Sequence, residues 1–107
     1  MTGFPKEVKK QVLSRASGHC ERCSHLSFTY HFHHRRPRGM GGSKADDTNT
    51  AANCVLLCPA CHRDVESDRV DALRWGWLVR QGCDPAQVPV LRRGNWVFLN
   101  TEGGFNP

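Results

Sequence analysis

The spacing of apolar and polar positions predicts short helices and strands in the first half of the chain. Apolar residues recur every four positions over residues 5–16, which predicts a helix with one buried face. Pro5 suits the first turn of this helix, and Gly18 follows its end. Alternation over residues 27–33 predicts a strand, and the apolar run at residues 55–57 predicts another. The buried face of the helix is formed by Phe4, Val8, Val12 and Ala16, with Leu13 beside them.

The pattern in the second half of the chain predicts helices followed by a β-hairpin. We expect a helix to begin near Cys61 and to break before a second helix over about residues 67–80. Residues 88–92 and 96–99 resemble the two strands of a β-hairpin, and a long Gly-rich polar loop fills residues 37–53. The inward face of the second helix is expected at Val70, Leu73 and Trp77. This order of elements predicts an α+β fold.

Length and composition then set the conditions for folding. The chain has 107 residues, which we expect to form a single domain over residues 1–107. Only 38% of the residues are hydrophobic, so a core this small needs extra cross-links. No apolar run is long enough to span a membrane, and the first residues lack the apolar centre of a signal peptide. We therefore expect an intracellular protein without a membrane partner, whose cysteines bind metal or take part in catalysis.

Two cysteine pairs have the spacing of a zinc site. Each pair has the form Cys-X-X-Cys, and 34 residues separate the two pairs. Two such turns that face each other match the tetrahedral coordination of Zn²⁺, with Zn–S distances of about 2.3 Å. Because four thiolates leave no open position on the ion, the role of this zinc is structural. The expected ligands are Cys20, Cys23, Cys58 and Cys61.

Other uses of the cysteines fit the sequence less well. A thioredoxin-like redox pair needs one Cys-X-X-Cys on a βαβ frame, and disulfides need an oxidising compartment. A ligand set of Cys54, Cys58 and Cys61 stays open, although it leaves Cys20 or Cys23 without a role. Cys54, which lies in an apolar strand, is interpreted as a buried inert thiol, and so is Cys83.

Positive charge is concentrated in the first part of the chain. Residues 1–44 carry nine basic and two acidic side chains, whereas residues 45–107 carry six basic and eight acidic ones. Such a distribution suits either an ordinary solvated surface or a polyanionic partner, of which nucleic acid is the common kind. Three arginines close to a histidine pair favour the second interpretation, with contacts to DNA phosphates. They are Arg35, Arg36 and Arg38.

Three histidines lie at the ends of elements that the cysteines would tie together. His33 and His34 end the first strand, and His62 directly follows Cys61. A zinc clamp would therefore allow His33 and His62 to meet at one cation, with His34 beside them. Asn53 opens the second strand, where its amide can hold an imidazole or a backbone carbonyl. The remaining histidines (His19, His25 and His31) are interpreted as ordinary surface or core residues, although His31 shares a strand face with His33 and could approach the same metal.

Taken together, these segments resemble the HNH endonuclease family. The resemblance rests on CERC, FHHRR, a GG-containing loop and NCVLLCPACH, and it covers about residues 20–66. It is closest to the small zinc-stabilised form that is frequent in bacteriophages. The resemblance implies a ββα-metal fold, here with an N-terminal helix and with a C-terminal helix plus β-hairpin.

The resemblance also implies a role for individual residues. His33 and His62 would be ligands of a catalytic cation, and His34 would be the general base that takes a proton from the attacking water. Asn53 would position His34 and tighten the loop. Many members have a further histidine four residues after the one matched by His62, where this chain has Glu66. Glu66 is therefore a possible extra metal ligand that favours Mg²⁺ or Mn²⁺ over Zn²⁺.

The implied activity is hydrolysis of DNA phosphodiester bonds with one divalent cation, Mg²⁺, Mn²⁺ or Zn²⁺, to leave a 5′-phosphate. Phage members of this size often work with the large terminase subunit during DNA packaging, so this subunit is the protein partner that the resemblance implies. The alternative is a non-catalytic, zinc-ribbon-like adaptor that binds DNA or protein. Such an adaptor would keep the four cysteines but would not need His34 or Asn53.

Overall fold

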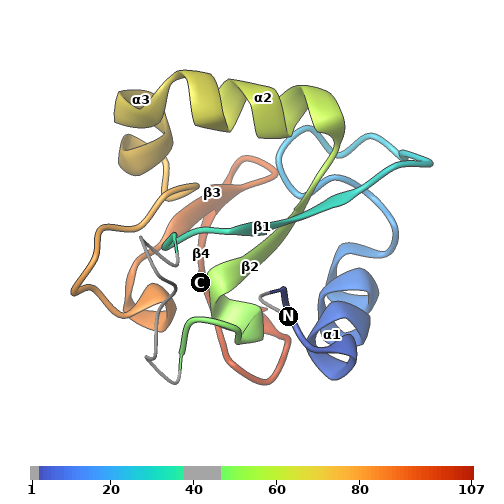
Figure 1. Cartoon of the computed structure of the whole chain (residues 1–107), viewed down its shortest axis with the longest axis horizontal. Helices are drawn as coiled ribbons and strands as arrows, with labels where there is room; N and C mark the ends of the chain where they lie inside the picture. Colours follow the sequence, from blue (N-terminus) through green and yellow to red (C-terminus); the bar gives the residue numbers. More distant parts are fainter. Residues whose placement is uncertain (1–2, 38–46) are drawn as a thin grey trace.

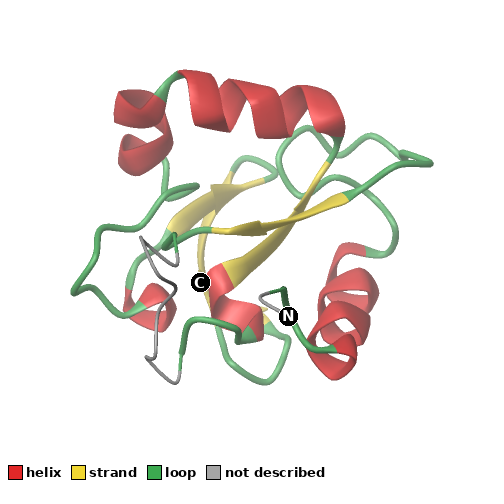
Figure 2. Cartoon of the chain, viewed as in Figure 1, coloured by secondary structure: helices red, strands yellow, loops and turns green. Residues whose placement is uncertain are grey.

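The computed structural model describes residues 3–37 and 47–107 and has a mixed α/β architecture (Figures 1 and 2). Two antiparallel strands lie at its centre, with helices on either side and a second small sheet behind them. The helices are α1 (Lys6–Ala16), α2 (Pro59–Ser67) and α3 (Arg69–Arg74), with 3₁₀ turns at Ala51–Asn53 and Pro85–Gln87. The strands are β1 (His31–His34), β2 (Cys54–Leu57), β3 (Val90–Arg92), β4 (Asn95–Leu99) and β5 (Phe105–Asn106).

Strands β1 and β2 divide the core into two parts. They pair antiparallel, with His33 opposite Val55 and His34 opposite Cys54. All four residues of β2 are buried because both faces of this strand are covered. Cys54 and Leu56 pack toward α1, whereas Val55 and Leu57 pack toward α2 and the second sheet. The ββα unit expected from the resemblance is therefore formed by β1, β2 and α2.

Helix α1 confirms the prediction for the start of the chain. Val12 and Ala16 are fully buried against β2, together with Phe4. Leu13, by contrast, lies on the exposed side. The helix ends where Ser17 adopts a left-handed conformation with φ of 55°.

The prediction of one helix over residues 67–80 is wrong. Helix α3 ends at Arg74, because Gly76 has φ of +84° and turns the chain back toward β3. A Cβ at this glycine would lie 2.1 Å from the carbonyl oxygen of Pro89, so the close approach requires glycine. As a result Val70 is 73% exposed, whereas Trp77, beyond the helix, is buried.

The C-terminal hairpin was correctly predicted. Val90 pairs with Val97 across β3 and β4, and Arg93 and Gly94 form the turn with φ of 50° and 84°. Two consecutive positive φ values are typical of the type I′ turn that suits a two-residue hairpin. Strand β5 adds a short third strand that the sequence did not predict. None of the described helices has the length and apolar character needed to cross a lipid bilayer.

Candidate metal centre and active site

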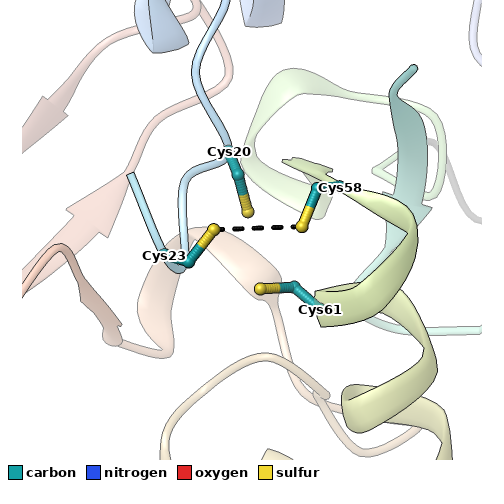
Figure 3. A group of neighbouring side chains, drawn as sticks. All are labelled: Cys20, Cys23, Cys58 and Cys61. Carbon is teal, nitrogen blue, oxygen red and sulfur yellow. Dashed lines mark hydrogen bonds between the residues drawn. The ribbon is translucent and has the colours of Figure 1, made fainter. Parts of the chain in front are cut away.

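The four predicted cysteine ligands lie together between the loop after α1 and the start of α2 (Figure 3). Their sulfur atoms lie within 4.8 Å of one another, and the Sγ atoms of Cys23 and Cys58 are 3.8 Å apart. Backbone hydrogen bonds lower the pKa of Cys20 to about 7 against the opposing effect of burial, so this thiol ionises near neutral pH. Four sulfurs converging on one point fit a tetrahedral zinc ion. Cys54 packs in the core beside α1 and is not part of this cluster, and Cys83 is exposed, contrary to expectation.

Glu21, within the first Cys-X-X-Cys turn, fixes that turn to the core. Its buried carboxylate accepts hydrogen bonds from Arg15 at 2.7 and 2.9 Å, from Arg92 at 2.8 Å and from the backbone N–H of Leu56 at 3.0 Å. Burial by itself raises the pKa of Glu21, but the charge and hydrogen bonds of these partners outweigh it and hold the pKa below its ordinary value. The carboxylate is therefore ionised and is held from several parts of the chain.

A second cluster of ligand atoms is formed by His33, His62 and Glu66. His33 lies near the end of β1, and the other two residues lie one turn apart on the same face of α2. The Oε1 atom of Glu66 is 3.9 Å from Nδ1 of His33 and 3.5 Å from Nε2 of His62. His33 is buried, whereas the side chain of Glu66 is 50% exposed. Two imidazoles and one carboxylate that converge in this way can hold a divalent cation and leave part of it accessible.

Both imidazoles of this cluster are in the neutral form that a metal ligand requires. The Nε2 atom of His33 is 3.0 Å from the carbonyl oxygen of Trp77 and donates to it, so Nδ1 carries the lone pair that faces Glu66. Burial lowers the pKa of His33 to about 4, and burial also lowers the pKa of His62, with a further contribution from His31. Both rings are therefore neutral at pH 7, which is the form that binds metal.

His34 lies beside this cluster on the other face of β1. Its ring stacks on Phe4 at 3.9 Å between centroids, with an interplanar angle of 16°. Its Nε2 atom is 2.8 Å from Oδ1 of Asn49. A hydrogen bond donated to this oxygen places the ring proton on Nε2 and makes Nδ1 the basic nitrogen. Phe4 was predicted only as a core residue, and Asn49 was not predicted to take part in the site.

Asn53 tightens the loop, as predicted, but its side chain does not hold His34. Its Oδ1 atom accepts from the backbone N–H of Arg36 at 2.7 Å. Its Nδ2 atom donates to the carbonyl oxygens of Arg36 and Thr48 at 3.1 and 2.8 Å. The amide is thus committed to the backbone on either side of residues 38–46, and Asn49 makes the contact with His34 instead.

The prediction that Arg35 contacts DNA is wrong. This side chain is fully buried, and its guanidinium donates to four backbone carbonyl oxygens at 2.8 to 3.0 Å. The chain turns inward at the end of β1, where these carbonyls converge and need donors, and guanidinium provides five N–H groups. The four acceptors belong to Ala52, Gly76, Pro85 and Val88.

The same correction holds for Arg36. Its buried side chain pairs with Asp47 and donates to the carbonyl oxygen of Cys83 at 2.8 Å, so it closes the loop and does not face a ligand. The Asp47 carboxylate benefits from this contact, which lowers its pKa. Arg38, the third predicted phosphate contact, lies outside the described residues.

A cleft of about 350 Å³ contains the candidate catalytic groups and also the positively charged side chain of Arg69, which was not among the predicted phosphate contacts. Arg69 is 57% exposed, and its Nη1 atom is 3.5 Å from Oε2 of Glu66. Arg69 was not among the predicted site residues, although its position three residues after Glu66, at helical spacing, was a usable signal. The cleft is lined by Phe32, His33, His34, Pro37, His62, Glu66, Arg69 and Leu78.

Comparisons with known proteins agree with this geometry. Residues 20–68 match the family described as HNH endonuclease. The chain is also 35% identical over 66 residues to the type IV methyl-directed restriction enzyme EcoKMcrA of Escherichia coli (strain K12). That match covers 54% of this chain and 22% of the relative, so the chain spans about a fifth of the length of that enzyme. No solved structure matches the chain significantly.

Proposed function

We propose that this chain, whose residues 20–68 form an HNH endonuclease domain, is a metal-dependent enzyme that hydrolyses phosphodiester bonds of DNA. Membership of that family implies metal-dependent nuclease activity. The observation that carries the proposal is the cleft, in which three metal-ligand side chains and a fourth group, the imidazole of His34, lie together. A zinc-ribbon-like adaptor would need the cysteine cluster but not this second constellation.

The donor atoms in the cleft fit a hard divalent cation. His33 through Nδ1, His62 through Nε2 and Glu66 through its carboxylate would hold the ion. A carboxylate among the ligands favours Mg²⁺ or Mn²⁺, while the four thiolates favour Zn²⁺. When bound, the catalytic cation supplies positive charge to the phosphate and to the leaving 3′ oxygen.

His34 is the proposed general base. Because Asn49 holds the proton on Nε2, the Nδ1 atom is the one that takes a proton from the attacking water. The stacked ring of Phe4 keeps the imidazole in one orientation, which a base must have relative to the phosphorus. Attack by water breaks the bond between phosphorus and the 3′ oxygen, which takes up a proton from solvent, and the products are a 5′-phosphate and a 3′-hydroxyl.

DNA is expected to bind through its backbone. Arg35 and Arg36 are committed to the interior. Among the described residues that line the cleft, Arg69 is the exposed arginine, and it is the proposed phosphate contact. The strength of such a phosphate contact depends on the salt concentration, and the contact does not distinguish one base sequence from another. The resemblance to phage members adds a narrower proposal, action with the large terminase subunit in DNA packaging. Co-purification of this subunit with the chain would test that partnership.

Nicking of supercoiled plasmid at low salt tests the nuclease. We expect relaxation with Mg²⁺ or Mn²⁺, none with EDTA, and a rate about 10²–10⁴-fold lower for His34→Ala. The matched control is His25→Ala, which removes an exposed imidazole that does not line the cleft and should cleave like the unmodified protein. Absence of cleavage with every cation would favour the adaptor, whereas equal cleavage by His34→Ala would overturn the assignment of His34 as the general base.

A further inference from the structure

His31, which shares a strand face with His33, contacts the metal cluster from outside through His62. We propose that His31 is a positioning residue that fixes the tautomer and orientation of His62, the proposed metal ligand on α2. This inference rests on the proposed metal site and extends it. His31 is not one of the three converging ligands.

The contact follows from the alternation of β1. Side chains two residues apart on a strand share a face, so His31 and His33 both point toward α2. His62 stands between them in the first turns of that helix, with ring centroids 4.8 Å from His31 and 5.1 Å from His33. The Nδ1 atoms of His31 and His62 are 2.7 Å apart, which is hydrogen-bond distance.

This short distance requires one nitrogen to donate and the other to accept. Nε2 of His62 faces Glu66 at 3.5 Å, and a nitrogen that binds metal must present a lone pair. A neutral His62 with a free Nε2 lone pair carries its proton on Nδ1, so it donates to Nδ1 of His31. The opposite arrangement would place a proton on Nε2 of His62 and block the ligand position.

Each of the two proposed histidine ligands therefore donates a hydrogen bond from the ring nitrogen that does not face Glu66. The backbone carbonyl of Trp77 accepts a hydrogen bond from His33, whereas the side chain of His31 accepts a hydrogen bond from His62. Outer partners of this kind typically change metal affinity by 10–100-fold when they are removed. Only the second partner can be removed by substitution, which makes the role of His31 testable.

The test measures Mn²⁺ affinity of the full chain, with its zinc retained, by calorimetric titration. We expect His31→Ala to raise the Kd for Mn²⁺ by about 10–100-fold. His31→Asn should restore affinity to near that of the unmodified protein, because its Oδ1 atom occupies the place of Nδ1 and accepts the same proton. His25→Ala is the control, and thermal melting with zinc content checks that each variant is folded.

The possible outcomes distinguish the role of His31 from the existence of the metal site. Unchanged Mn²⁺ affinity in a folded His31→Ala overturns the role of His31 but leaves the proposed nuclease standing. An Asn variant no better than the Ala variant also overturns it, because the effect would then come from packing and not from the accepted proton. Absence of Mn²⁺ binding by the unmodified chain overturns the metal site, and the inference about His31 with it.

Discussion

The two ligand clusters of this chain meet at α2, where Cys61 of one cluster and His62 of the other are neighbours, yet they differ in almost every other respect. Four sulfurs surround one point in the first cluster, whereas two imidazoles and the half-exposed Glu66 form an incomplete set in the second. A complete set suits an ion that only cross-links, and an incomplete set leaves room for water and substrate. Under the proposed function, the number of ligands distinguishes a structural ion from a catalytic ion within one turn of α2.

The surroundings of the two clusters differ as well. The turn that carries Cys20 and Cys23 is anchored by the buried Glu21 and the two arginines that pair with it. The position of this turn is therefore set by contacts in the core. The histidine cluster opens into a cleft with Arg69 beside it. We therefore expect the cysteine cluster to determine whether the chain folds and the histidine cluster to determine the proposed activity. Substitutions in the two regions should separate these effects.

The largest effect is expected from Cys58→Ser. Loss of a thiolate should remove the proposed zinc cross-link. Structural zinc contributes about 10–16 kcal/mol in small zinc domains, as much as the whole stability of many proteins. We expect loss of cooperative thermal unfolding by circular dichroism and loss of zinc by metal analysis. Cys83→Ser, at an exposed cysteine outside the cluster, should melt like the unmodified protein. A folded, zinc-free Cys58→Ser would contradict a structural role for the ion.

Glu21→Gln should have the next largest effect. Removing one charge from a buried ion pair typically lowers the free energy of unfolding by about 3–5 kcal/mol, because Arg15 and Arg92 keep buried charge without a counterion. Urea denaturation at pH 7 measures this difference. Glu102→Gln, at an exposed position, is the control and should change little.

The same pair of proteins has a defined dependence on pH. The pKa of Glu21 is lowered in the folded state, so its ionised form stabilises the fold above the unfolded pKa of about 4.3. That contribution is lost as pH falls through the lower, folded pKa. The stability gap between the unmodified protein and Glu21→Gln should therefore be full at pH 7 and should shrink below about pH 4. A gap independent of pH would show that the charge of Glu21 is not the source of its effect.

A smaller and purely local effect is expected from Glu66→Ala. Loss of this carboxylate should weaken Mn²⁺ binding by at least about tenfold, which is the lower end of the effect of an outer partner. Zinc content and melting temperature should stay unchanged, because the side chain is half exposed and lies outside the cysteine cluster. Equal Mn²⁺ affinity for Glu66→Ala and the unmodified chain would show that the carboxylate only faces solvent. Asp71→Ala, on the exposed side of α3, is the matched control.

The smallest effect is expected from Arg69→Ala, measured as DNA affinity at several salt concentrations in the His34→Ala background. Removal of one phosphate contact should weaken binding similarly for all sequences and make the salt dependence less steep by about one counterion. Arg74→Ala removes an equally exposed arginine of α3 that does not line the cleft and should leave the slope unchanged. Equal slopes for both variants would place the phosphate contact elsewhere.

Local patterns predicted much of the fold. Periodicity identified α1 and the C-terminal hairpin, because those elements bury one clear face or turn at a glycine. The break after α3 was missed, because it depends on Gly76 meeting the backbone of Pro89, a contact between segments distant in sequence. Spacing alone could not reveal such a contact.

The candidate site shows the same limit. The cysteines and histidines were found from residue type and spacing, which metal chemistry restricts tightly. Arg35 was misread because a charged residue beside a histidine pair resembles a ligand contact, while its four carbonyl acceptors come from segments that only the tertiary fold assembles. Residue chemistry was therefore predictable here, but the direction of a side chain at the end of a strand was not.

The pairing of β1 with β2 also constrains how this chain can change during evolution. Residues on one face of β1 meet α2, and those on the other face meet α1, as His33 and His34 illustrate. An insertion or deletion of one residue within this strand would exchange the two histidines, so the proposed ligand would meet Phe4 and the proposed base would meet His62. A change in the length of β1 is therefore expected to disrupt the proposed site, as substitution of its histidines would. Diversification by insertion is expected in the loops, away from the four residues His31–His34.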